Sequence, residues 1–311
     1  MFASIWSDIK REFEYGNTLT RVIIVNVVVF LLVNAIMISL YLFNRGIVPV
    51  FFYDLLHSFS LGKSWEHNLF HPWVIVTHMF LHQGFFHLLW NMLYLYWFGH
   101  IVGDLLGNHR VFPIYILGGL AGALVFFLTA NYFPNIGDYA LGASAAVMAV
   151  AVTAGVMAPD YIIRLVIFGE IRLKYIVAVL LLLDLIGVAT TTNSGGHFAH
   201  LGGALMGFAY AKMLRSGTDM ATPVLRVLES FSNLGHFFRT GKRKQKRPGP
   251  RLAYRNKSIA GSMSEKREAS AVQHSSGNNQ ERIDQILDKI RLSGYDSLSE
   301  DEKAFLNNLS R

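Results

Sequence analysis

Long apolar segments constrain this chain more than any other feature of its sequence. Residues 18–43 are almost wholly apolar, and about 20 apolar residues are enough for a helix to cross the roughly 30 Å hydrocarbon core of a bilayer. The chain of 311 residues is 52% hydrophobic and 16% charged, whereas soluble domains carry about 25% charged residues. The sequence therefore predicts a membrane protein.

Further apolar segments follow the first one and are separated by turn-forming sequence. They lie at 79–98, 112–130, 142–158, 175–191 and 198–214. Segments of this length in lipid are helices, because a helix satisfies its backbone hydrogen bonds within the segment. We therefore predict an all-α membrane protein whose six transmembrane helices form one bundle.

Basic residues outside the spans predict the orientation of the bundle. Lys and Arg precede the first span, lie between spans two and three and between spans four and five, and follow the sixth, whereas the opposite loops carry Arg45 and Lys63. An excess of Lys and Arg marks the cytosolic side. We expect an integral, multi-pass protein of a bacterial inner (cell) membrane with both termini in the cytosol.

Composition divides the chain into four parts. We predict a cytosolic N-terminal segment at 1–17, a membrane domain at 18–214, a basic low-complexity linker at 215–279 and a short helical hairpin at 280–311. The polar tail is expected to be mostly disordered, apart from an amphipathic piece early in the linker. Its basic run is expected to bind anionic membrane lipid and no nucleic acid.

The predicted hairpin has a recognisable helix start. Ser299 and Glu302 have the spacing of a capping box, in which each side chain bonds the backbone amide of the other residue. So small a unit has little core of its own, and we expect it to dock on an unidentified partner or on itself.

Glycines spaced four apart predict close packing between spans. Small residues on one helical face let two helix backbones approach each other. The pattern occurs at Gly99, Gly103 and Gly107, at Gly118 and Gly122, and at Gly203 and Gly207.

Ser144 and His200 are the residues whose chemistry suggests an activity. Both stand near the start of spans that enter from the same side of the membrane, so they can meet at a similar depth. A serine hydroxyl is a weak nucleophile until a base takes its proton, and a neutral imidazole is the commonest base. Taken alone, Ser144 could equally be a helix cap or a small interface residue.

The second span adds polar side chains that could stabilise negative charge. His87 and Asn91 are four residues apart and share a helical face. If Ser144 attacked a peptide carbonyl, these side chains and the Ser144 amide could stabilise the oxyanion.

Two rival interpretations remain: the His78 and His82 pair could bind a metal in a binding or transport protein, or the fold could bind membrane clients without catalysis.

Together these motifs resemble the rhomboid family of intramembrane serine proteases over residues 71–208. The similarity covers three spans: His82, His87 and Asn91 in the second, Gly142-Ala143-Ser144 in the fourth, and Ala199-His200-x-x-Gly203-x-x-x-Gly207 in the sixth.

The resemblance implies a serine endopeptidase that cleaves transmembrane protein substrates in or beside their membrane segments, with no metal or other cofactor. It implies a Ser144–His200 dyad without an acidic third member, His87 and Asn91 as oxyanion donors, and His82, Gly142, Gly203 and Gly207 as supporting residues.

Two departures from the family pattern concern the proposed site. Ala145 replaces the glycine that usually follows the serine, so we expect an extra methyl group beside the oxyanion site. Met148 stands where the family often places an aromatic residue below the catalytic histidine.

Two further groups of residues lie outside the motifs. Asp184, inside the fifth span, is expected to hydrogen-bond a neighbouring helix below the depth of Ser144 and His200, although a third catalytic role is an alternative. The first outer loop is expected to lie in the membrane interface, which the resemblance links to Phe51, Phe52, Trp65 and Trp73.

Overall fold

The computed structural model describes Ser7, 10–13, 16–165, 169–189, 193–240, 285–290 and 297–309, with the backbone alone for 231–240 and 306–309. The chain divides into two compact units, Met1–Lys244 and Gln245–Arg311. Each unit is described by itself.

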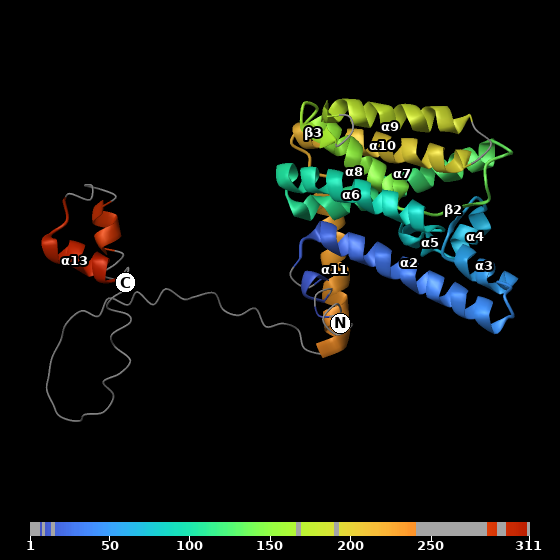
Figure 1. Cartoon of the computed structure of the whole chain (residues 1–311), viewed down its shortest axis with the longest axis horizontal. Helices are drawn as coiled ribbons and strands as arrows, with labels where there is room; N and C mark the ends of the chain where they lie inside the picture. The colour runs from blue at the N-terminus through green and yellow to red at the C-terminus, as the bar shows by residue number, and fades with distance from the viewer. Residues whose placement is uncertain are drawn as a thin grey trace, which may run out of the picture. The chain divides into compact units, whose positions relative to one another are not determined.

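The first unit is a helical bundle, as predicted (Figure 1). Its long helices are α2 (Thr18–Phe43), α6 (Phe85–Leu106), α7 (Val111–Tyr132), α8 (Ser144–Met157), α9 (Leu173–Val188) and α10 (Ser194–Arg215). Within the described residues, Thr18–Phe43 and Asn108–Tyr132 are long and apolar enough to cross a membrane by length and composition alone. Helix α8 is only 14 residues long, or about 21 Å at 1.5 Å per residue, which is shorter than the hydrocarbon core.

Helix α8 lies at the centre of the bundle, between α6 and α10 (Figure 1). Residues Ala145–Gly155 of this helix are all buried. Glycines on both sides make its position possible: a Cβ at Gly118 or Gly122 of α7 would overlap the methyl groups of Ala149 or Ala145.

On the other side of α8, the glycines of α10 touch its backbone. A Cβ at Gly203 would overlap the carbonyl oxygen of Ala145, and a Cβ at Gly207 would overlap that of Ala149. The predicted glycine contacts between spans are therefore confirmed for α7, α8 and α10. The first glycine set differs, because Gly99 packs on Leu19 of α2 whereas Gly107 ends α6 with φ +93°.

The second span was predicted to begin too early. Its helix starts at Phe85, and the preceding His78–Phe80 form the short 3-10 helix η1. The carbonyl groups of this segment serve tertiary contacts: the His78 carbonyl accepts the Gly142 amide at 2.9 Å, and the Met79 carbonyl accepts the Tyr115 hydroxyl at 2.6 Å. These bonds hold residues 78–82 outside the helix that sequence hydropathy extended over them.

The first outer loop folds into short helices: α3 (Val50–His57), α4 (Trp65–Phe70) and α5 (Val74–Thr77). Strand β1 (Leu61–Gly62) pairs antiparallel with β2 (Tyr139–Ala140), just before the segment that carries Ser144. Phe51, Trp65 and Trp73 are exposed, as expected for membrane-facing residues, but Phe52 is 4% exposed and belongs to the protein interior.

A β-hairpin connects α8 to α9 and was not predicted. Strands β3 (Ile162–Leu165) and β4 (Gly169–Arg172) pair antiparallel, with Ile162 opposite Arg172. The Asp160 carboxylate before the hairpin receives hydrogen bonds from Lys174 at 2.7 Å and Arg172 at 3.3 Å. The Lys174 and Arg172 partners hold the pKa of Asp160 below its usual value.

The connection after α10 is fixed to the loop between α6 and α7. Arg110 Nε donates to Asp219 Oδ2 at 2.9 Å, and Asp219 Oδ1 accepts from the Tyr210 hydroxyl and the Ala221 amide. The predicted amphipathic piece is a helix, α11 (Ala221–Thr240), and its first residue is fully buried. The compact unit thus extends beyond residue 214.

The second unit contains a helix at 285–290 and α13 (Glu300–Leu309). The predicted capping box is confirmed: the Ser299 amide donates to Glu302 Oε2 at 2.8 Å, and the Glu302 amide donates to Ser299 Oγ at 3.3 Å. Hydrogen bonding by Lys289, and by the Ser299 amide, lowers the pKa of Glu302 to about 2. The basic run and the predicted disorder fall in 241–284, outside the described residues.

Candidate active site

Ser144 is the first residue of α8, held there by the two residues that precede it. Gly142 has φ +136°, a conformation that favours glycine, and its amide is bound by the His78 carbonyl. The Ala143 amide donates to Nε2 of the buried His82 at 3.5 Å. His82 therefore contacts the turn that carries Ser144, in keeping with the support role predicted for it.

His87 lies beside this turn. A Cβ at Gly142 would stand 2.9 Å from His87 Cε1, 3.0 Å from His87 Nε2 and 3.6 Å from Ser144 Oγ. A side chain at position 142 would therefore press on His87 and stand next to the serine hydroxyl. The structure brings His87 and Ser144 together at one glycine.

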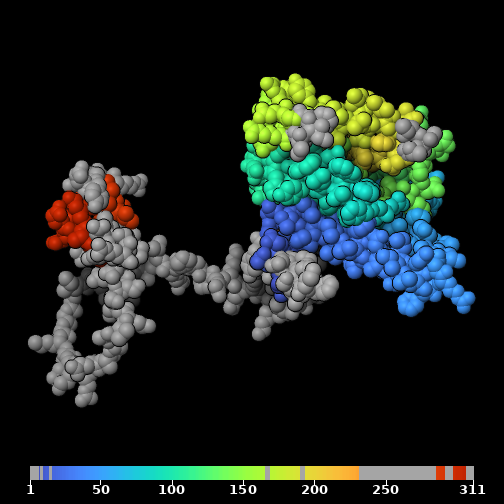
Figure 2. Space-filling view, in the orientation of Figure 1, coloured from blue at the N-terminus to red at the C-terminus, as the bar shows by residue number. Residues whose placement is uncertain are grey.

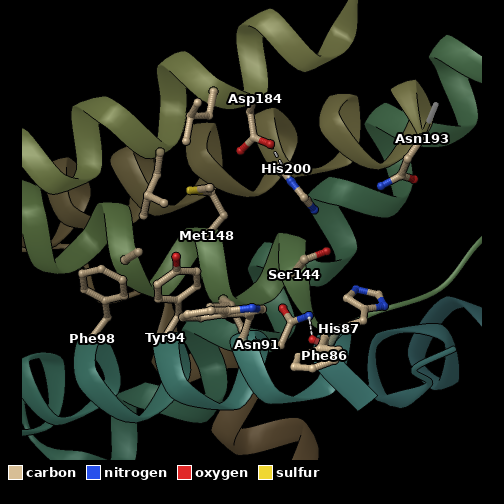
Figure 3. Close-up of a pocket in the computed structure, with 15 residues that line it drawn as sticks. Phe86, His87, Asn91, Tyr94, Phe98, Ser144, Met148, Asp184, Asn193 and His200 are labelled. Carbon is tan, nitrogen blue, oxygen red and sulfur yellow. Dashed lines mark hydrogen bonds and ion pairs between the residues drawn. The ribbon is translucent and has the colours of Figure 1, made fainter. Parts of the chain in front are cut away.

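His200, in the second turn of α10, faces the same space as Ser144 (Figure 3). Its ring points toward the serine side chain, and both residues line the same two cavities. Among the described contacts there is no hydrogen bond between them. Asn91 also lines one of these two cavities, and one hydrogen of its amide is donated to the His87 carbonyl at 2.8 Å.

The two cavities differ in chemistry. One, of about 420 Å³, lies between α6, α8, α9 and α10 and is largely apolar, with Phe86, Trp90, Phe98, Met148 and Leu183 among its lining residues. The other, of about 590 Å³, is lined by loop residues and polar groups that include Gln83, Asn135, Tyr139 and Ser194. Ser144, His87, Asn193 and His200 line both. Figure 2 shows the surface hollowed between α6 and the α9–α10 pair.

The expected obstruction by Ala145 is not found. Its methyl group packs on Gly122 of α7, and Ala145 lines neither of the two cavities that Ser144 shares with His200. The helix turns the side chain after Ser144 by about 100° from it, which directs it toward α7. Ala145 does line a small pocket of about 30 Å³ together with Gly142 and Ser144, but the methyl stays out of the cavities that Ser144 and His200 share.

Sequence reasoning preferred a structural role for Asp184 and kept a third catalytic role as the alternative. Asp184 Oδ1 of α9 accepts a hydrogen bond from His200 Nδ1 at 2.7 Å and another from His197 Nδ1 at 2.8 Å. Asp184 does bond a neighbouring helix, as expected, but the expected difference in depth is wrong. The dyad that the resemblance implies thus has a carboxylate within hydrogen-bond distance of His200.

The contact follows from helix bounds that the structure supplies. Helix α9 ends at Val188 and α10 begins at Ser194. In antiparallel helices, residues equally far from the connection stand opposite each other. Asp184 therefore stands opposite the stretch from His197 to His200, whereas the predicted spans end and begin too late to place these residues together.

The predicted alternative of a metal on His78 and His82 does not match the local fold. The two residues do not share a helix face, because η1 ends at Phe80. His78 Nδ1 bonds the Val74 carbonyl at 2.7 Å, and His82 Nε2 accepts the Ala143 amide. Among the described residues, the group with metal-ligand spacing is Asp184, His197 and His200, whose ligand atoms lie within 4.8 Å of one another.

Comparison with known proteins identifies two family matches in this chain. The Rhomboid domain model matches residues 69–217, and a family of unknown function (DUF6576) matches residues 275–311. The first match includes every residue of the site described above.

Individual relatives match a shorter share of their own length. Presenilin-associated rhomboid-like protein A, mitochondrial, of Danio rerio is 30% identical over 142 residues, which are 44% of this chain and 36% of the relative. Rhomboid protein 1, mitochondrial, of Saccharomyces cerevisiae is 33% identical over 144 residues, 44% of this chain and 40% of the relative. RHOMBOID-like protein 5 of Arabidopsis thaliana is 29% identical over 138 residues, which are 44% of this chain and 42% of the relative.

The matches thus span well under half of each relative. The family match agrees with the helical bundle. The chain is a membrane protein of the rhomboid family, with its rhomboid domain at residues 69–217.

Proposed function

We propose that this protein is an intramembrane serine endopeptidase that cleaves a peptide bond in or near transmembrane segments of membrane proteins. The observation that carries the proposal is the position of Ser144 and His200 between an apolar cavity and a polar cavity. The apolar cavity suits a substrate's membrane segment. The polar cavity suits an unwound peptide and the water that hydrolysis consumes.

In the proposed reaction, His200 Nε2 takes the proton of the Ser144 hydroxyl while Oγ forms a bond to the substrate carbonyl carbon. The carbonyl oxygen becomes an oxyanion. The peptide C–N bond then breaks, His200 gives its proton to the leaving amine, and an acyl-enzyme remains. Water, deprotonated by His200, attacks this ester, and the released Ser144 oxygen recovers the proton.

Oxyanion stabilisation is assigned to the amide of Ser144, Asn91 and His87. An α-helix leaves its first four N–H groups without intrahelical partners, and Ser144 is the first residue of α8. Asn91 Nδ2 keeps one hydrogen beyond the bond to the His87 carbonyl. Each such donor is worth roughly 2.7–4 kcal/mol of transition-state stabilisation in serine proteases.

A protein that binds membrane clients without cleaving them is the second candidate. Its main support in the sequence was Ala145, and this support is weakened because the methyl group packs on Gly122.

We also propose a multi-pass location with both termini on one side. Two of the named relatives are mitochondrial proteins, so the expected bacterial inner membrane has no support from these comparisons.

Purified protein incubated with a model transmembrane substrate, and separately with a fluorophosphonate probe, tests the proposal. We expect cleavage and labelling in the wild type, and loss of both in Ser144→Ala and in His200→Ala. Ser39→Ala, which changes an exposed serine of α2, is the matched control and should retain both. Labelling that persists in Ser144→Ala would contradict the serine mechanism, and zinc-dependent activity would favour the metal alternative.

A further inference from the structure

Asp184 is a carboxylate inside a membrane helix, and its surroundings in the bundle compensate its charge. It is 5% exposed. Burying an ionised carboxylate costs several kcal/mol unless donors satisfy it. Both donors to Oδ1 are ring Nδ1 atoms of α10, from His200 at 2.7 Å and His197 at 2.8 Å.

This geometry sets which nitrogen of His200 carries a proton. A carboxylate accepts hydrogen bonds, so the nitrogen that faces Asp184 is the donor. In a neutral imidazole the other nitrogen then has a free lone pair. Nε2 of His200 is therefore the basic atom, and the ring extends from Asp184 toward Ser144 (Figure 3).

No other side chain in the described part of the bundle fixes the ring in this way. Met148, four residues after Ser144, lines the apolar cavity and has no aromatic ring to stack on the imidazole. The ring contact recorded for His200 is with His197, edge to face at 5.8 Å. Orientation of the His200 ring thus depends on the carboxylate.

His197 bonds the same carboxylate oxygen as His200. Gly187 of α9 makes room for it, because a Cβ at position 187 would overlap the His197 ring. The second hydrogen bond holds the Asp184 side chain in place independently of His200. His200 can then accept and release a proton while its partner stays fixed.

We propose that Asp184 is a positioning residue of the active site, so that Ser144, His200 and Asp184 act as a three-membered group. The inference rests on the proposed peptidase function. Asp184 selects the Nδ1–H form of His200 and stabilises the imidazolium that forms when Nε2 takes the serine proton. The simpler alternative is that Asp184 only ties α9 to α10.

Four variants separate these roles. Asp184→Asn keeps the shape but removes the charge, and its amide can donate to Nδ1 and reverse the tautomer. Asp184→Glu restores a carboxylate. His197→Phe removes the second tie while leaving the bond to His200. Asp104→Asn makes the same chemical change at an exposed site of α6 and is the matched control.

The decisive readouts are kcat and KM for a transmembrane substrate, the rate of fluorophosphonate labelling, and Tm in the same detergent. For Asp184→Asn we expect kcat and the labelling rate to fall by about 10²–10⁴-fold with KM changed little, as for loss of the acid from other serine-protease triads. Asp184→Glu should recover part of the loss, and His197→Phe should stay within about tenfold of the wild type. A helix tie alone would lower Tm in Asp184→Asn and His197→Phe alike and leave kcat within a few fold, which would overturn the proposal.

A measurement independent of turnover keeps this test separate from the peptidase proposal. In protein labelled with ¹⁵N-histidine, assigned with His200→Ala, the His200 resonances should show a protonated Nδ1 and a bare Nε2. A proton on Nε2 in the wild type would overturn the positioning role even if the protein cleaves substrate. A wild type that neither labels nor cleaves would instead overturn the peptidase function, while the tautomer would still report on Asp184.

Discussion

Gly203 of α10 lies directly against the carbonyl oxygen of Ala145 in α8, leaving no space for a Cβ between the two helices. This contact joins the helix that carries His200 to the helix that carries Ser144. The atom that Gly203 meets belongs to the Ala145 backbone, so it cannot move aside by rotation of a side chain. The close approach of these two helices therefore requires glycine at position 203, as it does at position 207.

Gly203→Ala should accordingly separate α8 from α10. Overpacking of an interior typically costs about 1–3 kcal/mol, and we expect a lower Tm together with loss of most labelling by a serine-directed probe. Thermal unfolding in detergent and probe labelling measure the two effects. Gly84→Ala is the control, because nothing lies within 4 Å of a Cβ at that position. Equal effects of the two substitutions would show that the contact does not matter.

Ala145→Gly should not improve catalysis. The Ala145 methyl packs on Gly122 and lines only a small pocket beside Ser144, so its removal leaves the two cavities that Ser144 shares with His200 unchanged. We expect a loss of stability of about 1 kcal/mol, because glycine is unfavourable in a helix interior relative to alanine. Labelling rates and Tm measured side by side test this. A labelling rate raised tenfold or more would show that the methyl does obstruct the site.

The Arg110–Asp219 pair should make the stability of the bundle sensitive to acid. Burial raises the pKa of Asp219, but hydrogen bonds from Arg110 and the Ala221 amide outweigh it, and the pKa lies below the usual 3.8. A carboxyl group whose pKa is lowered by folding contributes stability above the unfolded-state pKa and loses it as pH falls through the folded-state value. The contribution is therefore present at pH 5 and declines below about pH 4.

Comparison of Tm for wild type and Asp219→Asn at pH 5 and pH 3 measures this contribution. The wild type should melt higher at pH 5, and the difference should shrink at pH 3. Asp104→Asn, at an exposed carboxyl group, should give no such difference. A gap between wild type and Asp219→Asn that stays constant with pH would mean that the carboxylate charge is unimportant.

Removal of residues 245–311 should leave catalysis intact. All the proposed chemistry lies between His82 and Gly207, inside the unit Met1–Lys244. We expect kcat/KM for a model substrate within about threefold of the full chain, because no residue of the site is removed. Size-exclusion chromatography and Tm should first confirm that the shortened protein is folded. Loss of cleavage in a folded truncation would assign the second unit a part in the enzyme.

The sequence by itself determined the helices and the reacting side chains. Length and hydropathy are local properties, so spans such as Thr18–Phe43 followed directly from the order of the residues. The same holds for the capping box of Ser299 and Glu302, which depends on a spacing of three residues. Ser144 and His200 were identified from motifs that are short and contiguous, so they can be read along the chain without knowledge of the fold.

Only the tertiary structure decided how those helices face one another. Hydropathy began the second span at residue 79, inside η1, because it does not register that the carbonyl groups of His78 and Met79 bond Gly142 and Tyr115. The direction of the Ala145 methyl follows from the packing of α8 on Gly122. The bond between Asp184 and His200 depends on the register of α9 against α10, which the connection and the side-chain directions set together. Chemistry that arises between helices thus required the packed bundle, because a pattern along one helix carries no information about its neighbour.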